Sequence, residues 1–339
     1  MTTSTTSPPA AASDAQPQHE RTHARTLAAL ILGIPSVIAL MLLAFAAPAL
    51  HSGPSNLPLA VSGPPPAVAQ LTGMLGQRAP GSFEVTTYDS AEAGAIAIRN
   101  REAVGGIAVG PTGVTIQTAS GAGAPYAALL KGMGGQLSAA GQHVTYAELA
   151  PVPSGDPAGS GLAALGLPLI FGGMATGAAL VLAYRGSITA RIATLLGVSV
   201  VAGLAATAIL QFGFGALDGN YLLVSTAVAA GVAAVAATIL GLGLLLSGPG
   251  IALGAILMLF VANPLSGLAT GAAWLPQPWG DIGQYLPLGA AGTAMRSAAY
   301  FDGAGATHAW VVLSCWVAAG LLLALAGAGR TNRAAAHAG

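Results

Sequence analysis

Residues 221–246 read YLLVSTAVAAGVAAVAATILGLGLLL, and this run determines the class of fold. It holds no Asp, Glu, Lys or Arg, and it lies within a longer stretch, 219–280, that also has none. An α-helix needs about 20 apolar residues to cross about 30 Å of hydrocarbon. A charge at the helix centre would cost about 2.5–3.5 kcal/mol. The run therefore predicts a transmembrane helix.

Five further runs of this kind predict a membrane all-α bundle of six transmembrane helices. Charged residues make up only 6% of the 339-residue chain, against about 25% in an ordinary soluble domain. The formal net charge is zero, which leaves no field to attract a nucleic acid partner. The five runs cover residues 27–49, 162–184, 192–214, 250–271 and 307–328, and Asn263 and Pro264 interrupt the run at 250–271.

The arginines indicate how the predicted helices are oriented. With six spans, three pairs of arginines fall on one side of the membrane, which the positive-inside rule makes cytoplasmic. Both termini are then expected in the cytoplasm, and the lipid bilayer is the expected environment. The pairs are Arg21 with Arg25, Arg185 with Arg191, and Arg330 with Arg333.

The first predicted helix has a second interpretation, because Ala47-Pro48-Ala49 resembles the cleavage site of a signal peptide. Its apolar run of about 23 residues is longer than the 7–15 residues of a signal peptide, and a polar tail of about 25 residues precedes it. These lengths favour an uncleaved anchor. Residues 1–20 are rich in Thr, Ser, Pro, Ala and Gln, which predicts disorder.

A small α/β domain is expected between the first two helices, on the outer side of the membrane. Residues 51–66 carry five prolines and predict a stiff connector. The pattern that follows predicts four strands in the order αβαββαβ. The helices are expected at 66–77, from a cap at Asp89–Glu92 to near Arg101, and at 124–140; the strands are expected at 83–88, 104–109, 114–118 and 144–149.

The chain is thus predicted to have five parts. They are a disordered cytoplasmic tail (1–26), a first transmembrane helix (27–50), an extracytoplasmic α/β domain (51–160), a five-helix transmembrane region (161–329) and a cytoplasmic tail (330–339).

No motif for catalysis, cofactor binding or metal binding is found in the sequence. His143 and the acidic residues of the predicted domain do not match a spacing such as HExxH, and the glycines do not match GxGxxG or the phosphate-binding GxxxxGK[ST]. We therefore expect no enzyme and no cofactor. Cys315, the single cysteine, lies in an apolar run and is expected to be buried. The absence of charge within the spans argues against a proton-coupled antiporter or an ion pump.

The stretch 262–302 is the most informative part of the membrane region. Asn263-Pro264 breaks the fifth predicted helix, because proline removes a helical hydrogen bond. Aromatic residues that favour the membrane interface follow, among them Trp279 and Tyr285. Two interpretations of 272–306 stay open: a short re-entrant or interfacial helical hairpin, or an ordinary outer loop with an aromatic belt.

Two segments resemble a known family. YDSAEAGAIAIRNREAVGGIAVGPTGVTIQTASGAGAP (88–125) is similar to the outer-domain pattern of the phage-infection-protein-like (YhgE/Pip) membrane proteins, within the permease superfamily of type-2 ABC exporters. ANPLSG, with LP..WG..GQYLPLGA...MRSAAYF after it, resembles the segment between the last two spans of such permeases. The shared layout of one span, an outer domain and five spans covers residues 27–328.

The resemblance implies a permease subunit in a bacterial cell membrane that exports a hydrophobic, lipidic or glycan-like substrate. It implies a homodimer or heterodimer of such subunits, with ATP hydrolysis by an ATPase on a separate chain. It also implies an outer gate or pathway at Asn263, Pro264, Gly267, Trp279 and Tyr285, and an ATPase-contact turn at Arg185, Ser187 and Arg191. The alternative is a non-transporting surface protein whose outer domain binds a cell-envelope partner or serves as a phage receptor.

Overall fold

The computed structural model describes residues 16–338. The predicted disorder of residues 1–15 therefore lies outside the described residues, as does Gly339. For residues 16–26 the prediction of a disordered tail is wrong, because helix α1 (Gln16–Leu50) begins at Gln16. The described residues form two compact units that divide between Ala47 and Pro48.

The described part of the chain contains five helices that are long and apolar enough to cross a membrane, which is consistent with a multi-pass membrane protein. The first of them is Arg25–Leu50, which lies within α1. The other four belong to the second unit and agree with the predicted runs to within four residues at each end. They are Gly161–Leu182 (α5, Gly161–Ala164, and α6, Gly166–Leu182), Ile188–Gly213 (α7, Ile188–Ala208, and a π-helix, Ile209–Gly213), Tyr221–Leu246 (α8), and Thr307–Arg330 within α12 (Thr307–Ala338).

The run at 250–271 forms a shorter helix than the sequence predicts. Helix α9 (Gly248–Ile256) continues as a π-helix (Leu257–Ala262) and stops there. The prediction of helix up to residue 271 is wrong, because Pro264 has no N–H to donate and turns follow it. At 1.5 Å per residue, Gly248–Ala262 rises about 22 Å, so it is too short to count among the five long helices.

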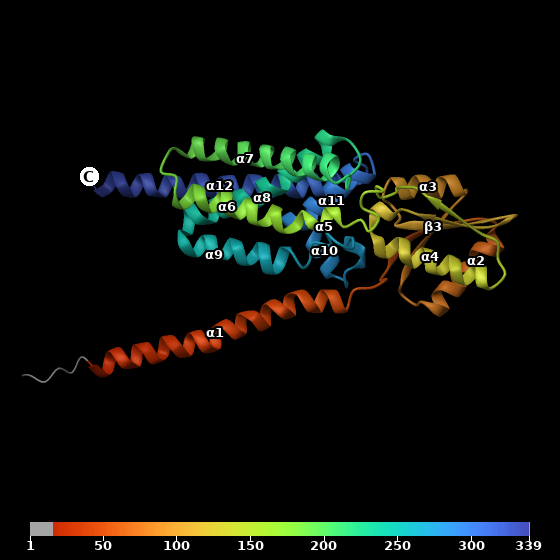
Figure 1. Ribbon diagram of the computed structural model, residues 1–339, viewed down its shortest axis with the longest axis horizontal. Helices are drawn as coiled ribbons and strands as arrows, with labels where there is room; N and C mark the ends of the chain where they lie inside the picture. Colours follow the sequence, from red (N-terminus) through yellow and green to blue (C-terminus); the bar gives the residue numbers. More distant parts are fainter. Residues whose placement is uncertain (1–15, 339) are drawn as a thin grey trace, which may run out of the picture. The chain divides into compact units, whose positions relative to one another are not determined.

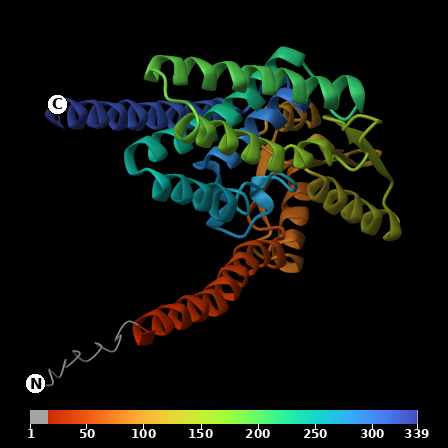
Figure 2. The same cartoon turned by 60° about the vertical axis from the view of Figure 1, so that its left-hand side comes forward.

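Helix α8 lies at the centre of a bundle formed with α6, α7 and α12, which run beside it in both views (Figures 1 and 2). It is rich in alanine and glycine, and most of its residues are buried. Small side chains let helix backbones approach closely. A Cβ added to Gly320 of α12, for example, would lie only 2.8 Å from the Cβ of Ala237 in α8. Cys315 on α12 is exposed, so the expected burial of this residue is wrong.

The second unit also contains a five-stranded sheet in the order β2-β1-β3-β4-β5. Four strands agree with the prediction to within one residue at each end. The expected connector at 51–66 is wrong over residues 57–62, which form strand β1 between β2 and β3. The sheet is mixed, because only β3 and β4 pair antiparallel. The strands are β1 (Leu57–Ser62), β2 (Phe83–Tyr88), β3 (Gly105–Gly110), β4 (Gly113–Thr118) and β5 (Val144–Glu148).

Helices cover both faces of this sheet, and Figure 1 shows α3 on the opposite side from α2 and α4. The alternation of side chains along β1 explains the two faces. Leu59 and Val61 belong to the core under α2 (Pro65–Arg78) and α4 (Ala124–Ala139), whereas Ala60 belongs to the core under α3 (Ala91–Arg99). We call residues 57–148 the α/β region and residues 161–338 the helical region.

The cap of α3 differs from the predicted one. Ser90, not Asp89, accepts a hydrogen bond from the N–H of Ala93 at 3.1 Å. Glu92 does not return to the cap, because its carboxylate pairs instead with Arg99 at the end of the helix.

Residues 272–306 fold into short helices against the bundle. A 3-10 turn (Ala272–Trp274) and helix α10 (Trp279–Gln284) lead into α11 (Pro287–Tyr300), which packs on α8 and α12. Nearly every residue of α11 is buried. Phe301, just after α11, shares a core with Ala60 and Ile98 of the α/β region. The helical region and the α/β region therefore pack on each other around α11.

Candidate functional site

A partly enclosed cavity of about 180 Å³ lies where the two regions pack together. Arg101 and Tyr126 line it from the α/β region, and Gly267, Thr293 and Arg296 line it from the helical region. Two arginines on one small cavity are unusual in a chain with so few charged residues. The cavity is therefore the candidate site that the structure offers.

Arg296 enters the cavity from the middle of α11 and is only 5% exposed. Its Nη1 donates a hydrogen bond to the carbonyl of Gly121 at 3.1 Å, and its Nη2 donates to the carbonyl of Leu268 at 2.7 Å. Burial lowers the pKa of this guanidinium, and tyrosines nearby act in the opposite direction. One side chain thus joins α11 to the α/β region and to the segment that follows the broken helix.

Arg101 owes its position to the way α3 ends. The N–H of Arg101 bonds to the carbonyl of Ile98 and the N–H of Glu102 bonds to the carbonyl of Ala97, at 2.9 and 2.8 Å. This is the Schellman arrangement, in which the residue after the cap is left-handed. Arg101 has a φ of +65°, although glycine usually fills this position.

The Arg101 side chain then reaches the helical region. Its Nη1 donates to the carbonyl of Thr293 at 2.9 Å, and its guanidinium carbon lies 5.3 Å from the centre of the Phe301 ring. Burial, followed by the charge of Arg296, lowers the pKa of Arg101 to about 10. The side chain therefore remains cationic at neutral pH.

Neither arginine has an acidic partner among the described residues. Arg99, two residues before Arg101, does have such a partner, because it pairs with Glu92 on the surface of α3. The partners of Arg101 and Arg296 are main-chain carbonyls and aromatic rings. The wall of the cavity therefore carries two positive charges that no carboxylate offsets.

Tyr126 supplies a neutral hydroxyl to the same wall. Its ring packs edge-on against Trp274, with 5.7 Å between the ring centroids. Burial raises the pKa of Tyr126 to about 12, against the opposing effect of Arg296. The hydroxyl is therefore protonated at neutral pH and adds no negative charge to the cavity.

The broken segment after α9 brings part of the predicted gate to this cavity. The Ser266 hydroxyl donates to the carbonyl of Asn263 at 2.7 Å, which closes a turn around Pro264. Gly267 follows with a φ of +62° and lines the cavity. Asn263 and Pro264 are half-buried and do not line it.

Trp279 and Tyr285 of the predicted gate lie outside the cavity wall. Their side chains are 50% and 63% exposed. The Tyr285 ring stacks edge-on against His308, and its carbonyl accepts a hydrogen bond from the Trp316 indole at 2.8 Å. These contacts hold α10 against the start of α12 and do not bring either ring to Gly267.

The predicted ATPase-contact turn joins α6 to α7. Ser187 caps α7, because its hydroxyl accepts a hydrogen bond from the N–H of Ala190 at 3.2 Å. Arg191 donates back across the turn to the carbonyl of Tyr184 at 2.7 Å. Arg185 is exposed. Arg191 thus stabilises the turn, whereas Arg185 is available to a partner.

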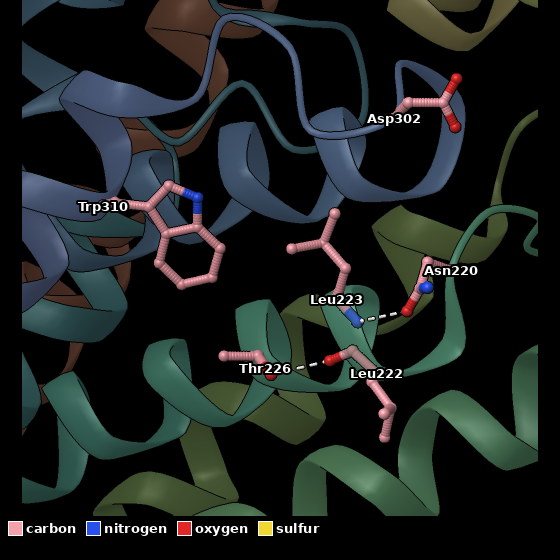
Figure 3. A pocket seen from close by; sticks show the side chains of 6 residues that line it. All are labelled: Asn220, Leu222, Leu223, Thr226, Asp302 and Trp310. Atoms are coloured by element: carbon pink, nitrogen blue, oxygen red, sulfur yellow. Dashed lines mark hydrogen bonds between the residues drawn. The ribbon is translucent and has the colours of Figure 1, made fainter.

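A larger and more open groove lies at the start of α8 and α12 (Figure 3). Two of its polar side chains already form hydrogen bonds with the main chain at the start of α8. The Asn220 side chain accepts from the N–H of Leu223, and the Thr226 hydroxyl donates to the carbonyl of Leu222. Trp310 and Asp302 complete its rim. The groove therefore offers few free groups with which to recognise a ligand.

The candidate site could be found only in part from the sequence. Arg101 was expected merely as the end of a helix, and Arg296 and Tyr126 were not expected in any site. One signal was present, because Arg296 is the only charged residue between Asp281 and Asp302. An arginine isolated in a stretch of small apolar residues indicates a specific partner.

In the part of the chain that the structure describes, no group of three or more His, Cys, Asp or Glu side chains is placed to hold a metal ion. Comparisons of the chain with protein-family models, with curated proteins and with solved structures give no match.

Proposed function

We propose that this chain is the permease subunit of an ABC-type exporter in a bacterial cell membrane, and that a separate ATPase chain supplies the energy. In this proposal it moves a hydrophobic, lipidic or glycan-like substrate outward and works as a homodimer or heterodimer. The proposal rests on the resemblance in residues 88–125 and 262–302 and on the arrangement around α11.

The observation that carries the proposal is the bridge made by Arg296. Its guanidinium bonds the main chain of the α/β region at Gly121 and the main chain after the broken helix at Leu268. A movement of the broken segment would therefore be transmitted to the α/β region. A bundle that only anchored a surface domain would have no need of such a link.

The topology is part of the same proposal. We count Gly248–Ala262 as the fifth of six spans. Its rise of about 22 Å is shorter than the roughly 30 Å of hydrocarbon, and the segment after it can cover the remaining thickness. Six spans place both termini in the cytoplasm and residues 51–160 outside. Arg185 then faces the cytoplasm, where an ATPase would dock, and residues 272–306 form a short helical insertion at the outer mouth.

The test is co-purification of the complex in mild detergent from the native host. We expect a nucleotide-binding subunit to copurify with the wild-type protein, and expect the double variant Arg185→Gln, Arg191→Gln to lose it. The matched control is Arg78→Gln, a variant of an arginine in the α/β region. Recovery of no ATPase with the wild-type chain, or equal recovery with the double variant, would contradict the proposal.

A second candidate is a non-transporting surface protein, and the edges of the sheet favour it. Strands β2 and β5 are the edge strands, and most of their side chains are exposed or half-buried. A free strand edge can pair with an extended segment of a partner. In that case, charge reversal of exposed edge residues such as Glu84 would abolish binding of a cell-envelope partner, and the double variant Arg185→Gln, Arg191→Gln would not.

A further inference from the structure

The cavity between the two regions contains an excess of positive charge that the fold itself does not explain. Arg101 and Arg296 both line it, and no Asp or Glu among the described residues lies within 4.0 Å of either guanidinium. Removing two like charges from water is costly unless opposite charge or good hydrogen bonds compensate. Here the compensation consists of carbonyl oxygens, which carry only partial negative charge.

Most of the N–H donors of each guanidinium make no hydrogen bond in the structure. A guanidinium has five N–H donors, and the structure gives Arg101 one hydrogen bond and Arg296 two. Guanidinium groups are the side chains best suited to bind oxyanions, because their planar fork donates two parallel hydrogen bonds. The remaining donors and the uncompensated charge both favour an anion in the cavity.

The structure assigns a phosphate-binding site to the cavity formed by Arg101, Arg296 and Tyr126. Its two sources of positive charge come from different regions of the chain, so a bound phosphate would be contacted by the α/β region and by α11 together. The Tyr126 hydroxyl, which is protonated at neutral pH, adds a neutral donor.

The size of the cavity limits the ligand to a small anion. Its volume of about 180 Å³ lies below the roughly 300–1,000 Å³ of pockets that enclose drug-sized molecules. A free phosphate or the phosphate of a lipid headgroup fits this limit, and a whole lipid does not. Both sources present the same chemistry to the arginines.

The alternative is that the two arginines only hold the regions together. Arg296 already donates to Gly121 and Leu268, and Arg101 already donates to Thr293. In that case substitution would lower stability, but phosphate would have no effect on any form of the protein. Binding measurements therefore separate the two roles. These binding measurements need no ATPase, so a failure of the phosphate site can be distinguished from a failure of the proposed function.

The experiment uses the full chain, purified in a neutral detergent and a phosphate-free buffer. Two probes are titrated: inorganic phosphate, against chloride at equal ionic strength, and dihexanoyl phosphatidic acid, against dihexanoyl glycerol. Melting temperature and calorimetric affinity are measured for each. We expect at least one phosphate probe to raise the melting temperature of the wild type. Binding of the lipid probe alone would identify a headgroup as the source, and binding of both would identify a free phosphate as sufficient.

The variants are Arg101→Gln, Arg296→Gln and Tyr126→Phe, with Arg99→Gln as the matched control. Arg99 lies two residues from Arg101 but is exposed and paired with Glu92. Loss of a charged hydrogen-bond donor is expected to weaken phosphate binding by about tenfold or more, and Arg101→Lys should recover part of the affinity. If Arg296→Gln does not fold, the affinities of Arg101→Gln and Arg101→Lys for phosphate still test the assignment.

Two results would overturn the assignment. One is the absence of any effect of either phosphate probe on the wild-type protein. The other is an affinity that Arg101→Gln leaves equal to that of Arg99→Gln.

Discussion

Arg296 donates a hydrogen bond to the carbonyl of Gly121, a residue 175 positions earlier in the chain. The same α11 that carries Arg296 ends at Tyr300, whose side chain lies against Gly121 as well. Gly121 is thus held between a guanidinium and an aromatic ring of one helix. The contact of the α/β region with the helical region depends on this close approach.

Substitution of Gly121 should weaken that contact. A Cβ at this position would lie 2.6 Å from the Cβ of Tyr300, and neither atom belongs to a flexible side-chain end. We expect Gly121→Ala to reduce the free energy of unfolding by about 1–3 kcal/mol, seen as a lower melting temperature in detergent. The control is Gly132→Ala, because Gly132 lies in α4 with open space around it. That change should stabilise by about 0.5–1 kcal/mol. Equal melting temperatures for the two variants would contradict the expected contact.

Close packing of α8 against α12 gives a second prediction. A Cβ at Gly320 would lie 2.8 Å from the Cβ of Ala237, so Gly320→Ala should push the two helices apart and lower the melting temperature. Gly197→Ala in α7 is the control, since nothing lies within 4 Å of that position. A Gly320→Ala protein as stable as the Gly197→Ala protein would show that the two helices pack less tightly than the structure has them.

Asp156 should make stability depend on acid pH. Its carboxylate accepts hydrogen bonds from the Gly161 N–H at 2.5 Å and the Ser160 hydroxyl at 2.8 Å. Burial acts to raise its pKa, but these hydrogen bonds prevail and hold the pKa below its ordinary value of 3.8. The folded state thus binds this proton less readily than the unfolded state. The stabilisation is complete above pH 3.8 and is lost as pH falls through the lower, folded pKa.

We therefore expect Asp156→Asn to destabilise the protein at pH 7 by about 1–3 kcal/mol. The gap in melting temperature between wild type and variant should narrow as the pH falls below about 4. The exposed Asp89→Asn serves as the control and should show neither effect. A gap that stays constant between pH 7 and pH 3 would be inconsistent with an ionised, hydrogen-bonded Asp156.

The proposed topology can be checked with single cysteines. Cys315 is replaced by alanine first, so that each introduced cysteine is the only thiol in the chain. In intact cells, a membrane-impermeant maleimide should label Gln142→Cys in the α/β region and should not label Thr189→Cys at the start of α7. Both residues are exposed. Labelling of Thr189→Cys alone would reverse the orientation, and labelling of both would place the two sites on the same side.

The long helices could be predicted from the sequence because each depends on a local property. A run such as Tyr221–Leu246 is apolar over its whole length, and the structure has a helix with the same bounds. Strand β2 (Phe83–Tyr88) likewise shows its alternation locally. Strand β1 was missed because proline-rich surroundings indicate a linker, and Pro58 within it lacks an N–H for the sheet. Its carbonyl nevertheless accepts a hydrogen bond from the N–H of Val104 at 2.9 Å.

The cavity could not be predicted because its residues meet only after the two regions have packed together. Arg101 and its acceptor Thr293 are 192 residues apart. The left-handed backbone at Arg101 adds to the difficulty, because the sequence signal for such a position is glycine. Local patterns predict which segments are helices and strands, whereas the meeting of Arg101 with Arg296 depends on how α11 docks.

The position of β1 inside the sheet, between β2 and β3, has a consequence for synthesis. Leu57–Ser62 leaves the ribosome first, but one of its two neighbours in the sheet, β3, follows about 50 residues later. At 5–20 residues per second, the strand waits roughly 2–10 s before it can pair on both sides. During that interval an apolar strand next to a newly inserted helix is open to other chains. Slowed translation between residues 62 and 105 would lengthen this exposure, and a chaperone that binds extended apolar segments would be needed most at this stage.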